Sequence, residues 1–279
     1  MNIFRKKVLI TVATYPLPSR SHDELVCTAG ILEDGSWIRI YPFPLSFISD
    51  LRNSGKLESY KYNWIELDLR KRTDDFRPES HSPANYDFRD LLLHGKLDTK
   101  HEWRERRDIC LRNVFTNLNE LIGHSKEPTY QSLATFKPTQ LIKFEVEEDE
   151  REWKREWQEQ LKQLDLFMPS QDGSSPKRVI RKLPYKFYYI FSDDAGRQSR
   201  LMIEDWEIGQ LFWNCLKSSD GNETKAIEKV KMRYWDEFKK KDLHLFLGTT
   251  KEWHARKAPN PFVIIGVFYP PKITQASLF

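Results

Sequence analysis

The sequence predicts an α+β fold in which small mixed β-sheets are packed against helices. Segments with β-branched or alternating apolar residues are interspersed with helix-like segments, without the strict alternation that a doubly wound sheet requires. The chain has 279 residues, of which 39% are hydrophobic and 13% aromatic, enough for one large core or two modest ones. We therefore expect a chain that folds without a partner.

Strands are expected in the first third of the chain. Residues 7–15 are apolar and β-branched, as in a buried strand, and prolines follow them. Residues 25–41 predict a hairpin, because the alternating segment 36–41 follows an Asp-Gly turn. Residues 62–69 alternate between apolar and charged side chains, which predicts a strand with one buried face. Residues 71–90 are polar and contain prolines, so we expect an exposed loop there.

Helices dominate the prediction for the middle of the chain. Residues 101–122 and 148–164 place apolar side chains at helical spacing, and a strand is expected between these helices at 140–146. The same patterns predict later strands at 185–191, 199–204, 243–247 and 262–268, and later helices at 206–217 and 223–240.

A linker is expected at residues 169–176, where Pro, Ser, Gly and Asp gather. It would divide the chain into an N-terminal lobe at 1–168, which includes the long helix 148–164, and a C-terminal lobe at 177–270. Residues 271–279 would form a tail.

The charge balance permits an anionic partner without demanding one. The 45 Lys and Arg residues are mixed with 41 Asp and Glu residues, which leaves a net charge of +4. The apolar stretch Val8 to Ala13 is too short for a signal peptide, and no run approaches the length of a membrane span. We therefore expect a cytoplasmic protein without a membrane partner.

The three cysteines do not suggest a disulfide framework or a structural zinc site. Cys27, Cys110 and Cys215 are widely spaced and odd in number, and none belongs to a CxxC pair. The sequence also lacks a Gly-rich phosphate loop, a GxSxG elbow and an HExxH motif. No cofactor or metal is predicted from these patterns.

Two short motifs carry the strongest functional signal. The first is Gln163-Leu164-Asp165-Leu166-Phe167, and the second is Gln275-Ala276-Ser277-Leu278-Phe279. Both resemble the pentapeptide with which bacterial polymerases and repair factors bind the DNA sliding clamp of the replicase. The first copy matches at every position, and the second departs from the pattern where Ala276 replaces the usual Leu.

The chemistry of the motif suits a short peptide anchor. Adjacent Leu and Phe side chains fill an apolar pocket, and the Gln amide fixes the direction of the peptide through hydrogen bonds. Two copies would add avidity on a ring with several equivalent pockets. In the alternative interpretation, Leu164 belongs to the apolar stripe of helix 148–164, and residues 275–279 are a frayed terminus.

A nuclease-like arrangement is a second hypothesis. Glu66, Asp68 and Lys71 lie on and after the strand predicted at 62–69, and they resemble the core of PD-(D/E)xK nucleases. That resemblance implies carboxylates that hold Mg²⁺ and a Lys that positions water. The Lys stands one residue further from the acid than in the nuclease motif, and the alternating charges also fit the solvent-facing side of a strand.

Two groups of residues suggest contacts with nucleic acid. In the first, aromatic rings at Trp37 and Tyr41 would stack bases, while nearby cations would follow the phosphates: Arg39, Arg70, Arg72 and Arg77, with Lys71 among them. The strand aromatics could instead belong to the core.

The second group is the turn after the strand predicted at 243–247. Here Thr249, Thr250, Lys251 and His254 offer hydroxyl, cationic and imidazole groups to a phosphate or a base. The alternative is a helix cap at Thr249 or Thr250, followed by a short helix.

The last hundred residues are loosely similar to PUA/ASCH-type nucleic-acid-binding folds, in the stretches Phe-Leu-Gly-Thr-Thr and Pro-Asn-Pro-Phe-Val-Ile-Ile-Gly-Val-Phe. Together these patterns predict a DNA-associated accessory protein that is recruited to the sliding clamp in replication, repair or defence against phages and plasmids. A Mg²⁺-dependent nuclease and an RNA-binding PUA-like module are the alternatives. The sequence leaves the oligomeric state open.

Overall fold

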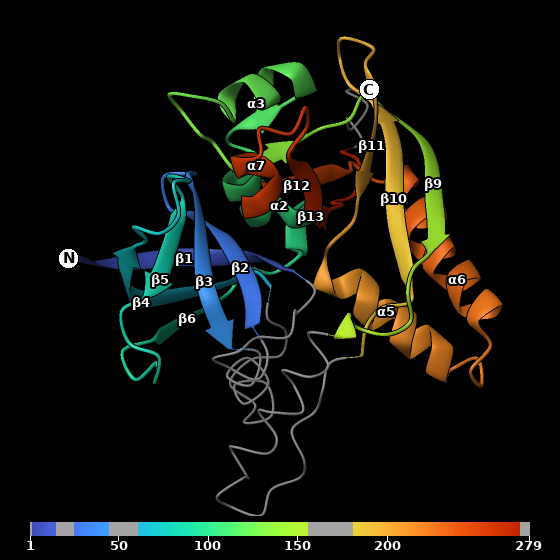
Figure 1. Ribbon diagram of the computed structural model, residues 1–279, viewed down its shortest axis with the longest axis horizontal. Coiled ribbons are helices and arrows are strands. Elements are labelled where there is room, and N and C mark those ends of the chain that lie inside the picture. The colour runs from blue at the N-terminus through green and yellow to red at the C-terminus, as the bar shows by residue number, and fades with distance from the viewer. Residues whose placement is uncertain (1, 15–24, 45–60, 156–180, 274–279) are drawn as a thin grey trace, which may run out of the picture.

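The computed structural model describes residues 2–14, 25–44, 61–155 and 181–273, and it has the α+β fold that the sequence predicts (Figure 1). Three β-sheets make up its framework. A barrel-like sheet lies on the left of Figure 1, a three-stranded sheet lies on the right, and a four-stranded sheet stands between them.

The first sheet closes on itself. Its strands are β1 (Ile3–Ala13), β2 (Leu25–Leu32), β3 (Trp37–Pro44), β4 (Asn63–Lys71), β5 (Ser80–Pro83) and β6 (Leu92–Lys96). Their order is β1-β2-β3-β5-β4-β6, and β1 pairs with β4 as well as with β2. A register shift between Ile10 and Val12 occurs in the pairing of β1 with β2. Apart from the parallel pair β3–β5, the pairings are antiparallel, so β1 to β5 form a five-stranded Greek-key barrel of the OB-fold type.

Alternation along β4 supplies part of the barrel interior, as predicted. Ile65, Leu67 and Leu69 are buried, whereas the residues between them are half-exposed. The interior is completed by apolar side chains from the neighbouring strands and the loop after β5: Val8, Ile10, Ile38, Ile40, Phe43 and Phe88. A period of two therefore places one face of each strand in the core.

The other two sheets belong to the second half of the chain. The three-stranded sheet has the order β11-β10-β9, and the four-stranded sheet has the order β13-β12-β8-β7. Their strands are β7 (Val114–Phe115), β8 (Leu133–Phe136), β9 (Gln140–Glu148), β10 (Tyr185–Ser192), β11 (Gln198–Met202), β12 (His244–Thr249) and β13 (Phe262–Phe268).

The described helices pack around these sheets. They are α2 (Lys100–Cys110), α3 (Leu118–His124), α5 (Trp206–Lys217), α6 (Glu223–Lys231) and α7 (Lys251–Ala255). Phe187, Tyr189 and Phe191 of β10 are fully buried in a core to which α5 and α6 also contribute. Asp205 caps α5 by accepting a hydrogen bond from the backbone N–H of Glu207, which explains where this helix begins.

A further apolar cluster joins the barrel to the four-stranded sheet. Leu9 and Ile31, on the outer face of the barrel, are buried in one cluster with Phe246 of β12 and Phe268 of β13. Trp37 meets Phe246 edge to face, with ring centroids 5.1 Å apart. The barrel therefore has an apolar interior and, where the four-stranded sheet packs against it, an apolar patch on its outer wall.

Several predicted elements are corrected by the structure. The single helix expected at 101–122 is wrong: α2 and α3 are separated by β7, and the Asn117 side chain caps α3 by accepting from the backbone N–H of Glu120. The loop expected at 71–90 contains β5, and its Asp75 and Arg77 are buried.

The long helix expected at 148–164 is also corrected in part. Strand β9 extends to Glu148, residues 149–154 are not helical, and residues 156–164 lie outside the described residues. The helix expected at 223–240 continues beyond α6 as a π-helical segment (Met232–Glu237) and a 3₁₀ turn (Phe238–Lys240).

The predicted linker at 169–176 likewise lies outside the described residues. Strand β9 before it pairs with β10 after it, so one sheet spans the two predicted lobes. None of the helices in the described ranges combines the length and the apolarity that a membrane-spanning helix needs.

Candidate nucleic-acid interface

Two segments that are far apart in the sequence meet at one edge of the barrel. The first is the β4–β5 loop (72–79), and the second runs from the end of β12 through α7 (249–256). Arg77 donates a hydrogen bond from Nη1 to the carbonyl oxygen of Thr249 over 2.7 Å, and Lys251 donates from Nζ to the carbonyl oxygen of Asp74 over 2.5 Å. The structure thus joins residues from the two groups that the sequence suggested separately.

A buried ion pair shapes the β4–β5 loop. The Asp75 carboxylate accepts from Nε and Nη2 of Arg77 at 2.9 and 2.7 Å, and both side chains are almost completely buried. Burial disfavours the charge on Asp75, but hydrogen bonds from Arg77 outweigh this effect and hold the pKa of the carboxyl well below its usual range. The loop is therefore held in one conformation by a matched pair of charges.

His254 lies beneath this loop. Its Nε2 is 2.5 Å from the carbonyl oxygen of Ser125, which can only accept, so Nε2 carries the hydrogen. Its Nδ1 then accepts from the Thr249 hydroxyl, 3.0 Å away. Burial lowers the pKa of His254, and the neutral ring is the form that satisfies both neighbours.

Aromatic rings reach the surface above His254. The Phe76 ring lies edge to face against His254 at 4.9 Å between centroids and against Tyr130 at 5.6 Å. Phe76 is 43% exposed and Tyr130 is half-buried, and Trp253, which precedes His254 in α7, is 51% exposed. Phe76 is held in place by His254 and Tyr130, and an exposed ring that is held in place is suited to stacking against a flat ligand.

Cationic side chains accompany these rings. The Arg256 guanidinium lies over the Trp253 ring, 5.6 Å from its centroid, and the exposed Lys251 lies beside the loop. Arg72 stacks over Tyr41 at 5.2 Å and donates a hydrogen bond to the carbonyl oxygen of this tyrosine.

Thr250 has the helix-cap role of the alternative prediction, because its hydroxyl accepts from the backbone N–H of Trp253.

Trp37 and Arg39, two residues of the predicted stacking group, pack against the second half of the chain. Trp37 is part of the apolar contact with Phe246. Arg39 is buried and donates from Nη1 to the Ser132 hydroxyl over 2.7 Å, while the Glu79 carboxylate accepts from the same hydroxyl. Trp37 is half-buried and packs against the four-stranded sheet, as the alternative interpretation expects of a strand aromatic.

This arrangement changes which part of the barrel is open to a ligand. OB-type barrels bind oligonucleotides on the face of strands 2 and 3 and through the loops that join strands 1 to 2 and 4 to 5. Here the four-stranded sheet covers the outer face of β2 and β3, as the burial of Ala29, Ile31 and Arg39 shows. The β4–β5 loop is accessible, and it carries Phe76.

Two family models cover almost the whole chain. The model of a domain of unknown function, DUF8757, matches residues 115–279, and the model of a second domain of unknown function, DUF8758, matches residues 4–112. The chain belongs to the DUF8757 family. No curated protein matches the chain.

The two matched regions meet where the architecture changes. The DUF8758 region contains the barrel and α2, and the DUF8757 region begins at β7 and contains the other two sheets. The interface described above lies across this division, with Phe76 on the DUF8758 side and both Tyr130 and Trp253 on the DUF8757 side. The interface therefore needs aromatic side chains from both regions.

The residues of the nuclease hypothesis are not gathered in the DUF8758 barrel. Glu66 and Asp68 share the Arg5 guanidinium, at 2.9 and 3.3 Å, and His94 contacts Glu66 at 2.6 Å. Lys71 instead donates from Nζ to the carbonyl oxygens of residues 77, 78 and 80. Within the described ranges, no three His, Cys, Asp or Glu side chains are arranged to hold a metal ion.

The remaining predicted residues are less informative. Arg70 is half-buried, and its Nε has no hydrogen-bond partner in the described part of the chain. Both clamp-like motifs, at 163–167 and 275–279, lie outside the described residues.

Phe76, Tyr130 and Trp253 are not among the residues predicted from the sequence. A signal exists for Phe76, which is the single large hydrophobic side chain in the polar stretch 70–82. Tyr130 gives no such signal, because its place beside Phe76 depends on how the barrel meets the second half of the chain.

Proposed function

We propose that this protein binds single-stranded DNA at the interface of Phe76, Tyr130 and Trp253, and that a clamp-binding motif recruits it to replicating or damaged DNA. The observation that carries the proposal is the meeting of the β4–β5 loop with α7, which exposes aromatic rings beside cations. Such a protein works on the nucleoid, in the cytoplasm.

The chemistry of the interface favours unpaired bases. Every base has a flat face, and stacking on an aromatic side chain contributes about 1–3 kcal/mol per base. The rings of a duplex are already stacked on one another, whereas those of a single strand are free to meet Phe76 and Trp253. Lys251 and Arg256, which are exposed and paired with Asp74 and Glu252, would exchange these carboxylates for phosphates, so the binding should weaken as salt is added.

Recruitment rests on the motifs at 163–167 and 275–279. Ile273, the last described residue before the second motif, is 63% exposed, which supports access of a partner to that end of the chain. Burial of Leu278 and Phe279 in an apolar pocket would contribute roughly 3–6 kcal/mol before the cost of ordering the peptide. This is enough for micromolar affinity when the rest of the protein is held nearby.

Binding of a labelled single-stranded oligonucleotide tests the interface. We expect the variant Phe76→Ala/Trp253→Ala to bind about 10-fold or more weakly than wild type, because two stacking platforms are removed. Tyr86→Ala is the matched control, since it removes another exposed ring, 47% accessible, from the loop after β5. Equal affinity of all three proteins would refute the interface, and a strong preference for RNA would favour the RNA-binding alternative.

Titration against purified sliding clamp tests recruitment. We expect micromolar binding that is weakened by Leu278→Ala/Phe279→Ala, by Leu166→Ala/Phe167→Ala, or by both changes together. A wild-type protein that does not bind the clamp, or variants that bind as well as wild type, would end this part of the proposal. Because the titration contains no DNA, its result is independent of the oligonucleotide experiment.

A further inference from the structure

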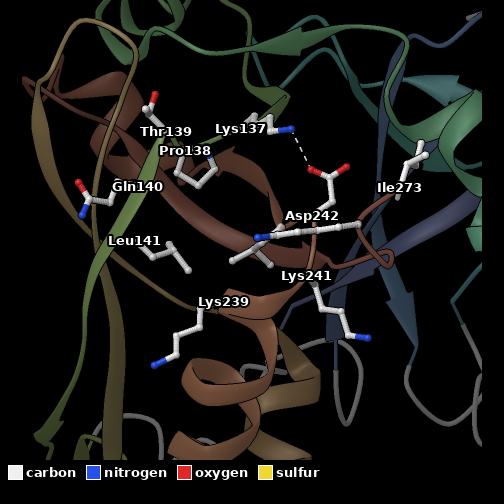
Figure 2. A pocket seen from close by; sticks show the side chains of 11 residues that line it. Lys137, Pro138, Thr139, Gln140, Leu141, Lys239, Lys241, Asp242 and Ile273 are labelled. Atoms are coloured by element: carbon white, nitrogen blue, oxygen red, sulfur yellow. Dashed lines mark hydrogen bonds and ion pairs between the residues drawn. The ribbon is translucent and has the colours of Figure 1, made fainter. Parts of the chain in front are cut away.

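A basic pocket opens on the DUF8757 region (Figure 2). It has a volume of about 660 Å³ and is formed by the segment that leads into β9, by the residues before β12, and by Lys272 and Ile273. Four lysines line it: Lys137, Lys239, Lys241 and Lys272. Figure 2 shows the ammonium group of Lys137 directed at Asp242, the one carboxylate in the described lining, whereas the side chains of Lys239 and Lys241 point away from Asp242 in different directions.

The negative charge of Asp242 is already matched. Its carboxylate contacts Nζ of Lys137 and Nη1 of Arg107, each at 2.8 Å. Burial opposes ionisation of Asp242, but the hydrogen bonds from Lys137 and Arg107 outweigh this effect and lower its pKa. The carboxylate therefore stays charged, and its negative charge is shared between Lys137 and Arg107. It does not neutralise the other lysines of the pocket.

The other lysines add excess positive charge. Lys239 forms an ion pair with the Asp236 carboxylate at 3.4 Å, so the excess charge of the pocket comes from Lys241 and Lys272. Lys241 and Lys272 are exposed and take part in no ion pair found within the described residues. Several like charges around one cavity raise the positive potential inside it, because the protein walls focus the field.

The lining also limits the chemical class of ligand that the pocket can bind. It contains Pro138, Leu141, Leu243 and Ile273 beside the lysines, but no aromatic side chain among the described residues. A base therefore finds no ring on which to stack, whereas phosphoryl oxygens find several ammonium donors. Lysine binds phosphate as a point charge without demanding one orientation.

We propose that this pocket binds the phosphate backbone of double-stranded DNA. The choice of DNA rests on the proposed function: Lys272 precedes Gln275 of the second clamp-like motif by three residues, so a chain bound through that motif holds the pocket close to the duplex in the ring. A duplex presents its phosphates outward and hides its bases, which fits a pocket with cations and no stacking platform. The aromatic interface and the pocket thus take different forms of DNA.

The test uses the full-length protein, a labelled blunt-ended duplex and no clamp. We expect Lys241→Glu/Lys272→Glu to bind the duplex roughly tenfold more weakly. The slope of log affinity against log salt concentration should also fall, by the amount that corresponds to about two lost phosphate contacts. Lys217→Glu/Lys225→Glu is the matched control, because it makes the same change of charge at exposed lysines outside the pocket. Lys241→Gln/Lys272→Gln should show an intermediate loss, since it removes the charge without reversing it.

Three outcomes would overturn the proposal. The pocket variants bind the duplex as well as wild type, or the control loses as much affinity as they do, or wild type binds inorganic tripolyphosphate but not the duplex. The last result would assign the pocket to a small polyphosphate. Phe76→Ala/Trp253→Ala should keep its affinity for the duplex, so failure of the pocket and failure of the aromatic interface are distinguished.

Discussion

Nη1 of Arg77 lies 2.7 Å from the carbonyl oxygen of Thr249, and this hydrogen bond links the DUF8758 barrel to the DUF8757 region. The other side of the same guanidinium is held by Asp75 through two hydrogen bonds. One buried cation therefore fixes the β4–β5 loop and attaches it to the end of β12. The position of Phe76, between Asp75 and Arg77, follows from this link.

Loss of Arg77 should be costly. We expect Arg77→Ala to lower the free energy of unfolding by about 3–5 kcal/mol, because it leaves the Asp75 carboxylate buried without its counter-ion. Denaturant unfolding measures this change. In Arg89→Ala, which breaks an ion pair whose arginine is 89% exposed, the loss should stay below about 1 kcal/mol. Similar losses in the two variants would show that the Arg77 pair does not hold the loop.

A second buried charge pair crosses between the regions. Nζ of Lys61 is 3.0 Å from both carboxylate oxygens of Asp205 and 3.0 Å from Glu207, and burial raises the pKa of Asp205 to about 6. We expect Lys61→Met to cost about 3–5 kcal/mol of stability at neutral pH, and Lys61→Met/Asp205→Asn to recover part of it. Asparagine can still cap α5.

The effect of Lys61→Met should depend on pH. A carboxyl whose pKa is raised in the folded state binds protons more tightly there than in the unfolded state, so its contribution to stability is lost as the pH rises. The Lys61 charge favours the ionised form of Asp205, so Lys61→Met raises the pKa of this carboxyl further, and the cost of the substitution should be larger at pH 8 than at pH 5. Unfolding curves at the two pH values give the comparison, and a cost that is independent of pH would contradict it.

The buried histidines predict a loss of stability in mild acid. Burial lowers the pKa of His81, His244 and His254, so the unfolded chain takes up protons first as the pH falls below about 6.5. The contribution of the neutral histidines to the free energy of unfolding is fully present above that pH and decreases below it. The difference in unfolding free energy between pH 7 and pH 5.5 should shrink in His254→Gln, which cannot titrate. An unchanged difference would mean that His254 is not responsible.

Replacement of Gly30 and of Gly123 by alanine should change the stability of the protein in opposite directions. A Cβ at Gly30 of β2 would lie against the backbone carbonyl oxygen of Leu9 and the Val8 side chain, so Gly30→Ala should cost about 1–3 kcal/mol. A Cβ at Gly123 of α3 meets nothing within 4 Å, and Gly123→Ala should stabilise the protein by roughly 0.5–1 kcal/mol. Thermal unfolding compares the two, and changes of equal sign would contradict this account.

Local patterns predicted most elements of the fold. The strand at 262–268 and the helix at 206–217 have the predicted bounds, because a uniform apolar run or a capped amphipathic segment needs no distant information. The helix predicted at 101–122 is wrong because apolar residues such as Val114 fit a short strand as well as a helix. Its pairing with Thr135 of β8 decides between the two, and this pairing is not visible in a local window.

The candidate site was predictable in pieces. The residue types at Arg72, Arg77, Lys251 and His254 suggested contacts with nucleic acid, but their convergence depends on closure of the barrel and on its packing against β12. Trp37 shows the limit of local patterns, since the same alternation fits a ring exposed to a ligand and a ring packed on Phe246. The long-range partner of a strand face decides which one occurs.

The apolar outer wall of the barrel has a consequence for how the two families occur together. Leu9 and Ile31 are covered in part by α2, which belongs to the DUF8758 region, and in part by Phe246 and Phe268 of the DUF8757 region, so a chain without the latter would expose apolar side chains. Splitting the gene between the regions would yield two polypeptides that must associate to remain in solution. A protein that carries the barrel without the DUF8757 region would have to cover these apolar side chains in another way.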